Sequence, residues 1–321
     1  MAAKKLQIAL YWGAGCGGCD VAVLDTNEFI LDVASLADIR LWPIAVDGKY
    51  EDVEAMADSE LDLTIFNGAV RNSENEHLAK LLRRKSKLLI AFGSCAHMGG
   101  IPGLANFTNR EEILTRVYLQ NPSIEPGNKK IPHPETQVDG QLLHLPHFFK
   151  RVYKLADIVP VDYFLPGCPP APEQVKLSIL AIAAGKLPPK GSTIGAAERN
   201  VCDDCQRSKS EKKIKRFYRP QEIIQDPEKC LLEQGLVCMG PVTRSGCGVR
   251  CPESGLGCRG CYGPAPDVLD QGTKFISALG SIIDSKDPKE IEAIISGLSD
   301  LSAILYRFGL PASFLQRSLK S

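Results

Sequence analysis

The chain has 321 residues, which is long for one average domain and short for three independent ones, so we expect two domains and an appendage. Its 38 Lys and Arg residues balance 38 Asp and Glu residues, and a net charge of zero does not favour nucleic acid as a partner. No run reaches the roughly 18 apolar residues that a membrane span needs, and the start lacks the layout of a secretion signal. We therefore expect a cytoplasmic protein without a membrane span.

The first part of the chain, up to about residue 187, alternates apolar runs with helical stretches. The runs expected to form strands are LQIALYW at residues 6–12, followed by IRLWPIAV, LDLTIFNGAV, KLLIAFGSC and VDYFLPGCPP, and the stretch VAVLDTNEFILDVASLAD is expected to be helical. This alternation predicts an α/β domain whose parallel sheet is covered by helices on both faces. Functional loops of such a sheet lie at the carboxyl ends of its strands.

Four cysteines follow this rule. Cys16 and Cys19 come directly after the first predicted strand, Cys95 ends a later strand, and Cys168 ends the last one. Three separate strand ends therefore converge on one crevice, which indicates a shared ligand. Glycines surround these cysteines, and glycine lets backbone N–H groups approach a ligand closely.

Residues 99 to about 155 are rich in Pro, Gly, Asn and His and predict a long loop insertion, with one helix near EEILTRVYLQ. Long loops inside compact domains are usually functional. His133, His144 and His147 lie in this insertion. They contact another subunit or belong to a solvated loop, and the sequence does not decide between the two.

Eight more cysteines lie between Val201 and Gly263, in a segment with little periodic hydrophobicity. Such a segment does not build a large apolar core alone, so we expect bound metal to supply much of its folding energy. From Pro264 onward the pattern is helical again, and this tail packs on the body or on a neighbouring subunit. The predicted divisions are residues 1–187, 188–263 and 264–321.

Metal binding explains twelve cysteines better than disulfides do, because disulfides are rare in reducing compartments. A 4Fe-4S cluster needs four thiolates, two of which a Cys-x-x-Cys pair supplies, and twelve cysteines make three such sets. A Cys-x-x-Cys pair taken alone fits structural zinc equally well. A thioredoxin-like pair leaves ten cysteines unexplained, and no G-x-G-x-x-G follows the first strand, which disfavours nucleotide binding.

The segments YWGAGCGGCD, AFGSCAHMGG and LPGCPP resemble the small subunit of nickel-iron hydrogenases. The resemblance implies a flavodoxin-like domain in which Cys16, Cys19, Cys95 and Cys168 bind the proximal cluster, next to a large subunit that carries the nickel-iron centre. A complex I subunit shares this signature. Its relatives have adjacent cysteines in the first motif and no cysteine-rich second domain, whereas Gly17 and Gly18 separate the pair here.

The order of the remaining cysteines also resembles this family. Carried over by motif, Cys202, Cys205, Cys230 and Cys238 resemble the distal ligands, and Cys247, Cys258 and Cys261 the medial ones. Many members have histidine at the position of Cys202 and proline at that of Cys251, so the cysteines here imply three 4Fe-4S clusters with thiolate ligands only. All twelve cysteines are then cluster ligands, and none is catalytic. Such clusters run at low potential, because imidazole ligands raise it.

An all-cysteine, cytoplasmic relay most resembles that of the viologen-reducing hydrogenases that associate with heterodisulfide reductase. The electron acceptor would then be a subunit with an iron-sulfur or flavin cofactor. Alternatives are a deazaflavin-reducing hydrogenase or sulfhydrogenase, a complex I-like quinone-reducing module, and a zinc-rich assembly protein. The basic run RSKSEKKIKRFYR, residues 207–219, docks an acidic acceptor or forms a solvated face. His97 tunes the proximal cluster, relays protons or is a hydrogen-bonded loop histidine.

Overall fold

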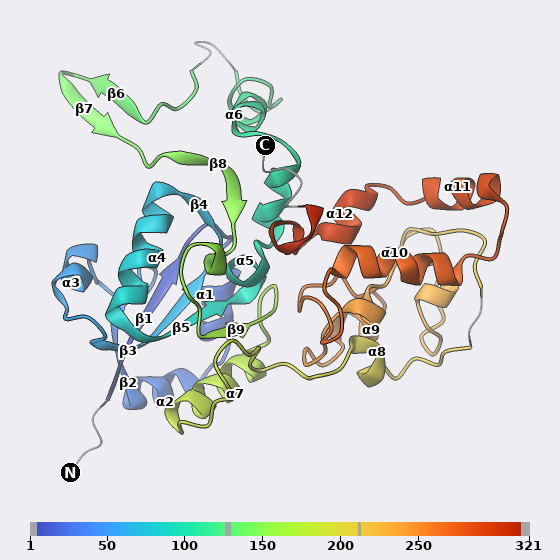
Figure 1. Cartoon of the computed structure of the whole chain (residues 1–321), viewed down its shortest axis with the longest axis horizontal. Coiled ribbons are helices and arrows are strands. Elements are labelled where there is room, and N and C mark those ends of the chain that lie inside the picture. The colour runs from blue at the N-terminus through green and yellow to red at the C-terminus, as the bar shows by residue number, and fades with distance from the viewer. Residues whose placement is uncertain (1–4, 126–129, 211–212, 316–321) are drawn as a thin grey trace.

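The computed structural model describes residues 5–125, 130–210 and 213–315, and parts of the predicted insertion, basic run and helical tail lie outside these ranges. Two lobes lie side by side along the long axis of the molecule (Figure 1). We call the part from β1 to α7, Leu6–Ala183, the sheet lobe, and the part from α8 to the last 3₁₀ turn, Val201–Ala312, the cysteine-rich lobe. Within the described ranges, no helix has the length and apolar character needed to cross a membrane.

The sheet lobe is built on five parallel strands. They are β1 (Leu6–Trp12), β2 (Ala37–Leu41), β3 (Leu61–Asn67), β5 (Ser86–Phe92) and β9 (Tyr163–Leu165), and their spatial order is β2-β1-β3-β5-β9. This is the doubly wound, flavodoxin-like order, with β3 at the centre between β1 and β5. The predicted α/β fold and all five of its strands are confirmed. The second strand ends at Leu41, two residues before Pro43, rather than running to Val46.

Helices cover both faces of this sheet, as alternation along β1 requires. Ala9 and Tyr11 face one core together with α3 (Tyr50–Ala55) and α4 (Ser73–Lys85). Ile8 and Leu10 face the other core, which α1 (Gly18–Leu24), α2 (Phe29–Leu36) and α7 (Pro172–Ala183) complete. Neighbouring residues of a strand point to opposite faces, so a strand buried on both sides is apolar throughout.

The insertion between β5 and β9 contains more regular structure than the sequence predicts. The expected helix is confirmed as α6 (Arg110–Tyr118); α5 (Gly93–Met98) and a 3₁₀ turn (Ile101–Phe107) precede it. A hairpin of β6 (Glu135–Val138) and β7 (Gln141–His144) follows, and β8 (Phe148–Tyr153) pairs with the short β4 (Val70–Asn72). Every residue of the hairpin is exposed, so its sequence lacks the alternation that marks a half-buried strand.

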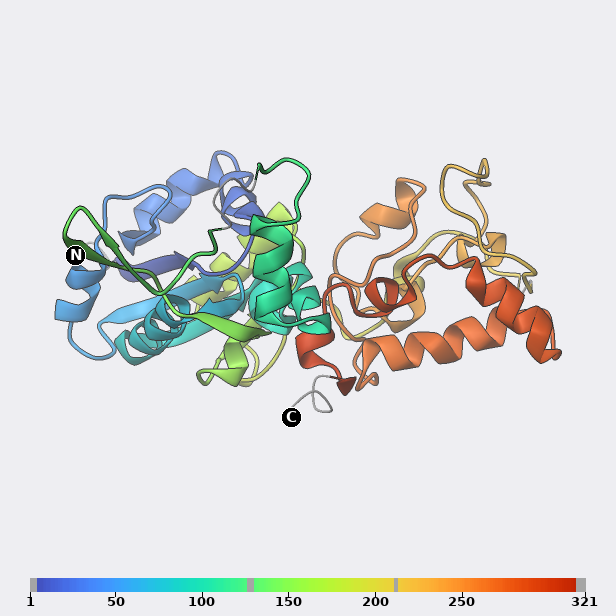
Figure 2. The same cartoon turned by 90° about the horizontal axis from the view of Figure 1, so that it is seen from above.

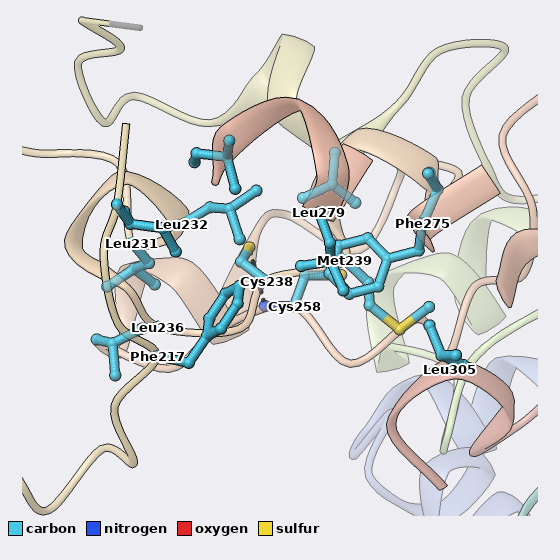
Figure 3. Packing of buried hydrophobic residues seen from close by; sticks show 14 of the residues in the cluster. Phe217, Leu231, Leu232, Leu236, Cys238, Met239, Cys258, Phe275, Leu279 and Leu305 are labelled. Carbon is cyan, nitrogen blue, oxygen red and sulfur yellow. Dashed lines mark hydrogen bonds between the residues drawn. The ribbon is translucent and has the colours of Figure 1, made fainter. Parts of the chain in front are cut away.

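The cysteine-rich lobe has short helices and one shared core. Its helices are α8 (Val201–Asp204), α9 (Arg250–Glu253), α10 (Gln271–Ile282), α11 (Pro288–Ser296) and α12 (Leu301–Tyr306). Figure 3 shows Phe275 and Leu279 of α10 packed around Met239, Cys238 and Cys258. The C-terminal helices therefore pack on the body of the protein and complete the apolar core that the cysteine-rich segment lacks on its own.

Residues 308–312 return to the boundary between the lobes (Figure 2). The backbone N–H of Gly100 donates to the carbonyl of Phe308 at 2.9 Å. Pro311 lies against two glycines of the sheet lobe: a methyl group at Gly99 would lie 2.2 Å from its ring, and one at Gly103 would lie 2.5 Å away. We call this contact the proline notch. It exists only because these two residues have no side chain.

Candidate iron-sulfur sites

The four cysteines of the sheet lobe meet at the carboxyl edge of the sheet. Cys16 lies in the loop after β1, Cys19 in the first turn of α1, Cys95 in the first turn of α5, and Cys168 between β9 and α7. Burial raises the pKa of Cys19 far above its ordinary value, and the nearby thiols of Cys95, Cys168 and Cys16 act in the same direction. Burial raises the pKa of Cys95 to about 12, and the nearby thiols of Cys168 and Cys16 act in the same direction. The convergence predicted from the three strand ends is thus present.

Glycines keep this site open around the sulfur atoms. A methyl group at Gly93 would lie 2.3 Å from the Sγ atom of Cys19, and one at Gly100 would lie 2.4 Å from that of Cys95. Both glycines have positive φ angles, +81° and +59°, which residues with side chains rarely adopt. A Cβ atom at either glycine would fill the space beside these sulfur atoms. That space fits a compact group held by the four sulfurs.

A buried carboxylate fixes the helix that carries Cys19. Asp20 accepts hydrogen bonds from the indole of Trp42 at 2.8 Å and from the amide of Asn67 at 2.9 Å. It thereby joins the start of α1 to the carboxyl ends of β2 and β3. Burial raises the pKa of Asp20, and these two hydrogen bonds oppose the rise. The sequence gives no sign of this role beyond the position of Asp20 next to a predicted ligand.

A second set of four cysteines surrounds a cavity of about 300 Å³ at the boundary between the lobes. The cysteines that line it are Cys247, Cys251, Cys258 and Cys261, together with Cys168 of the first set. Burial, followed by the thiols of Cys168, Cys247 and Cys251, raises the pKa of Cys261 to about 12. This set contains Cys247, Cys258 and Cys261, which the resemblance assigns to the medial position, and Cys251, which stands where many members have proline.

The third set lies deeper in the cysteine-rich lobe. Burial raises the pKa of Cys202 to about 12, Cys238, Cys230 and Cys205 act in the same direction, and Lys209 opposes them. A methyl group at Gly240 would lie 3.0 Å from the Sγ atom of Cys202 and 3.6 Å from that of Cys238. These are the four residues assigned to the distal position.

Direct contacts join the three sets in series. The Ser94 hydroxyl, next to Cys95, donates to the carbonyl of Cys261 at 2.6 Å. Farther on, the backbone N–H of Cys258 donates to the Sγ atom of Cys238 at 3.3 Å. The first set therefore adjoins the second, and the second adjoins the third.

Thiols with raised pKa values are poor nucleophiles at neutral pH, because the thiolate is the reactive form. Four neighbouring thiols ionise together only when cations balance their charge, which metal ions do. The donor sets thus suit metal binding rather than thiol-disulfide chemistry. Among the described residues, no three His, Cys, Asp or Glu side chains converge closely enough to hold a single metal ion.

The other residues singled out by sequence have distinct surroundings. His97 stacks on Phe164, with ring centres 4.9 Å apart, and its Nδ1 atom has no hydrogen-bond partner among the described residues. It is not the hydrogen-bonded loop histidine considered above. In the basic run, Arg207 donates to the carbonyls of Pro252, Asp226 and Lys229, and Lys209 to that of Cys202. These two cations thus bind backbone next to cysteines of the second and third sets, Lys209 from an exposed position, and residues 211 and 212 of the run lie outside the described ranges.

A flavodoxin-like sheet with thiols at three strand ends, continued by eight thiols in a second lobe, is the arrangement of an iron-sulfur electron-transfer subunit. The family described as NADH ubiquinone oxidoreductase, 20 Kd subunit, matches residues 16–182. The iron-sulfur subunit of the F420-non-reducing hydrogenase of Archaeoglobus profundus is 42% identical over 98% of this chain and 99% of its own length. A subunit of the F420-non-reducing hydrogenase of Methanothermobacter thermautotrophicus is 36% identical over 99% of this chain and 98% of its own.

A third relative, a subunit of the F420-non-reducing hydrogenase vhu of Methanococcus voltae, is 37% identical over 98% of this chain and 99% of its own length. The chain belongs to the small subunits of nickel-iron hydrogenases, in the family of these F420-non-reducing hydrogenase subunits. It is thus an electron-transfer subunit of a hydrogenase, and a large subunit is its partner. The resemblance stated from the sequence is confirmed, including its F420-non-reducing, that is non-deazaflavin-reducing, type.

Proposed function

We propose that this chain binds three 4Fe-4S clusters and carries electrons from the hydrogenase large subunit to a separate acceptor. The proximal ligands are Cys16, Cys19, Cys95 and Cys168, the medial ligands Cys247, Cys251, Cys258 and Cys261, and the distal ligands Cys202, Cys205, Cys230 and Cys238. The observation that supports this most directly is the grouping of the twelve thiols into three adjoining sets of four. Such clusters, when bound, accept and release single electrons.

We further propose that the chain acts in the cytoplasm and passes its electrons to an iron-sulfur or flavin subunit of a heterodisulfide reductase complex. Thiolate ligation alone favours low cluster potentials, which suit such an acceptor. In the same scheme, residues 1–187 form one domain, residues 188–263 carry the medial and distal clusters, and residues 264–321 form the C-terminal extension.

Elemental analysis tests the number of clusters. Protein purified without oxygen should contain about twelve iron atoms and about twelve acid-labile sulfides per chain, and no stoichiometric zinc. About eight of each would reduce the proposal to two clusters. Zinc without sulfide would contradict it and favour a structural role for the cysteines.

A pair of variants tests the order of the clusters. Cys205→Ala removes a distal ligand, so it should stop reduction of the external acceptor while hydrogen-deuterium exchange at the large subunit continues. Cys16→Ala removes a proximal ligand and should stop the reduction of every acceptor, artificial dyes included. If Cys205→Ala abolished isotope exchange in a folded complex that retains nickel, the assigned order would be wrong.

A further inference from the structure

A cation without a partner lies beside the second cysteine set. Arg259 stands between Cys258 and Gly260 in the Cys-x-x-Cys pair, and it lines the same cavity of about 300 Å³ as the four cysteines of this set. The residue is partly buried, and its guanidinium forms no ion pair or hydrogen bond with any residue that the structure describes. Buried cations normally have an anionic partner, because removal from water is costly. The cysteines of this cavity, once ionised, are neighbouring anions.

The charge of Arg259 acts on one of these cysteines. Burial raises the pKa of Cys251, the thiol of Cys247 acts in the same direction, and the charge of Arg259 opposes them. An arginine stays protonated in proteins, so this positive charge is permanent. Arg259 therefore stabilises the ionised form of Cys251, which is the form that binds metal.

A second cavity that Arg259 lines brings no negative charge to it. This cavity has a volume of about 100 Å³, and Tyr218, Leu236 and Ile304 are among the residues of its walls. None of the described residues that line it is Asp or Glu. An electrostatic interaction is stronger where apolar walls exclude water, so the charge of Arg259 is only weakly damped on this side.

The other charged groups around the first cavity are paired or exposed. Arg250 also lines it, but its guanidinium binds the carboxylate of Glu173 at 2.7 Å, and its side chain is 57% exposed. Asp25 contributes a carboxylate to the cavity wall, and it is exposed as well. Arg207 donates to three backbone carbonyls and does not line the cavity. Solvent screens exposed charges, so Arg259 is the charged group best placed to act on a ligand here.

The other two cysteine sets have different charges beside them. In the first set, the carboxylate of Asp20 acts, after burial and the neighbouring thiols, to raise the pKa of Cys19. In the third set, the charge of Lys209 opposes the rise in the pKa of Cys202, but Lys209 is exposed and its ammonium donates to a backbone carbonyl. Of the two cations, Arg259 is the one that is more shielded from solvent.

The ligands cannot make the three proposed clusters differ, because each cluster has the same four thiolates. Differences in potential must then come from the protein around each site, through its charges, its burial and its hydrogen bonds to sulfur. A group held by four thiolates gains one negative charge with each electron that it accepts. A nearby positive charge stabilises the more negative form more strongly, so it raises the reduction potential.

We propose that the guanidinium of Arg259 compensates the negative charge of the medial cluster and thereby raises the reduction potential of that cluster. This inference rests on the proposed function, in which the second cysteine set binds the medial 4Fe-4S cluster. It adds a residue that is not a ligand and that sets how strongly the middle of the relay attracts electrons.

The test compares Arg259→Met, which removes the charge and keeps a long side chain, with Arg259→Lys, which keeps a positive charge. Each variant is purified without oxygen as the complete hydrogenase complex, and its clusters are titrated by electron paramagnetic resonance at controlled potentials. The medial signal is assigned as the one that Cys251→Ser alters. Arg259→Met should shift the midpoint potential of this signal in the negative direction by about 59 mV or more, which corresponds to an about tenfold change in a one-electron equilibrium. Arg259→Lys should retain most of the wild-type potential.

Arg250→Met is the matched control, because it removes a paired and exposed charge from the wall of the same cavity. It should shift the medial potential far less than Arg259→Met does. An equal shift would show that the medial potential follows the net charge of the chain, and it would overturn the assignment to Arg259. An unchanged medial potential in Arg259→Met, with full iron content, would overturn it as well.

Iron content separates compensation of charge from a steric role. If Arg259→Met lost about four iron atoms per chain, the titration would be made on Arg259→Gln, which is neutral and polar, and the same negative shift is expected. Loss of this iron from both neutral variants, but not from Arg259→Lys, would support the proposal, and loss from all three would overturn it. If no signal of the wild-type complex responded to Cys251→Ser, the proposed function itself would fail, which is a different result from an unchanged potential in Arg259→Met.

Discussion

In the sheet lobe the cysteines lie at the edge of the parallel sheet, whereas in the cysteine-rich lobe two cysteines belong to the hydrophobic core. Cys238 and Cys258 are buried in the same cluster as Phe275 and Leu279. Cys16 and Cys168, in contrast, are exposed beyond the ends of strands whose cores contain no cysteine that is fully buried. We therefore expect the sheet lobe to fold without its bound group and the cysteine-rich lobe to depend more strongly on what its cysteines bind.

Removal of iron should produce the largest difference in stability between the two lobes. After anaerobic chelation, amide protons from Val201 to Gly263 should lose most of their protection, because metal binding supplies folding energy there. Amides of β1, β3 and β5 should stay protected. Hydrogen-exchange mass spectrometry measures both regions in one sample. Equal loss of protection in the two lobes would show that the sheet also depends on its cluster.

A glycine variant in the sheet lobe should have the next largest effect. Gly93→Ala places a methyl group 2.3 Å from the Sγ atom of Cys19, at a φ of +81°, so it should displace the thiol and lose about four of the iron atoms. Gly140→Ala is the matched control, since its φ is +79° and no atom lies within 4 Å of the added methyl. Both should lose about 1–2 kcal/mol of unfolding free energy from backbone strain. Retention of all iron by Gly93→Ala would contradict the placement of the proximal site.

The proline notch links the lobes, and a methyl group there should change the free energy of unfolding rather than the iron content. Gly103→Ala places its methyl 2.5 Å from the ring of Pro311 and should lower the unfolding free energy by about 1–3 kcal/mol through overpacking. Faster exchange of the Gly100 amide, which is bonded to Phe308, should accompany it. Gly280→Ala in α10 is the control, because nothing lies within 4 Å of its added methyl. Normal exchange at Gly100 would show that the notch does not hold the lobes together.

The smallest expected effect concerns pH. Burial, followed by the charges of Arg244 and Lys154, lowers the pKa of His97 from 6.5 to about 4. Between these two pKa values His97 is protonated in the unfolded chain and neutral in the folded chain. The free energy of unfolding therefore falls as the pH drops from about 6.5 to about 4. His97→Phe should remove this part of the dependence. Thermal melting at pH 7 and pH 5 measures it, and equal slopes for both proteins would contradict it.

The sequence predicts the sheet lobe well because a parallel sheet leaves a strong pattern. Leu6–Trp12 is an apolar run that both faces of the sheet require, and the cysteines that follow it had to lie at the carboxyl edge. The predicted helix over residues 21–38 breaks into α1 and α2, since Asn27 adopts a φ of +55° between them. Local conformations of this kind are decided by packing and leave little trace in composition.

The core of the cysteine-rich lobe could not be predicted from the hydrophobic pattern of the sequence. Its apolar residues, such as Val201 and Leu231, are scattered among cysteines and turns, and their partners on α10 come more than forty residues later. The contact between the guanidinium of Arg71 and the ring of Phe148, 4.3 Å apart, was equally hard to predict, because the two residues lie far apart in the chain. Both features arise from contacts between distant segments, which neither periodicity nor motif spacing records.

The proline notch also sets an order of events during synthesis. Cys261, the last cysteine of the chain, precedes Pro311 by fifty residues, so every thiol has left the ribosome before the notch residue is made. Until Pro311 seats against Gly99 and Gly103, nothing at this point holds the end of the chain over the loop that follows Cys95. The nascent protein thus has an interval in which all twelve thiols have been made and the boundary between the lobes is still open, and Pro311 closes it.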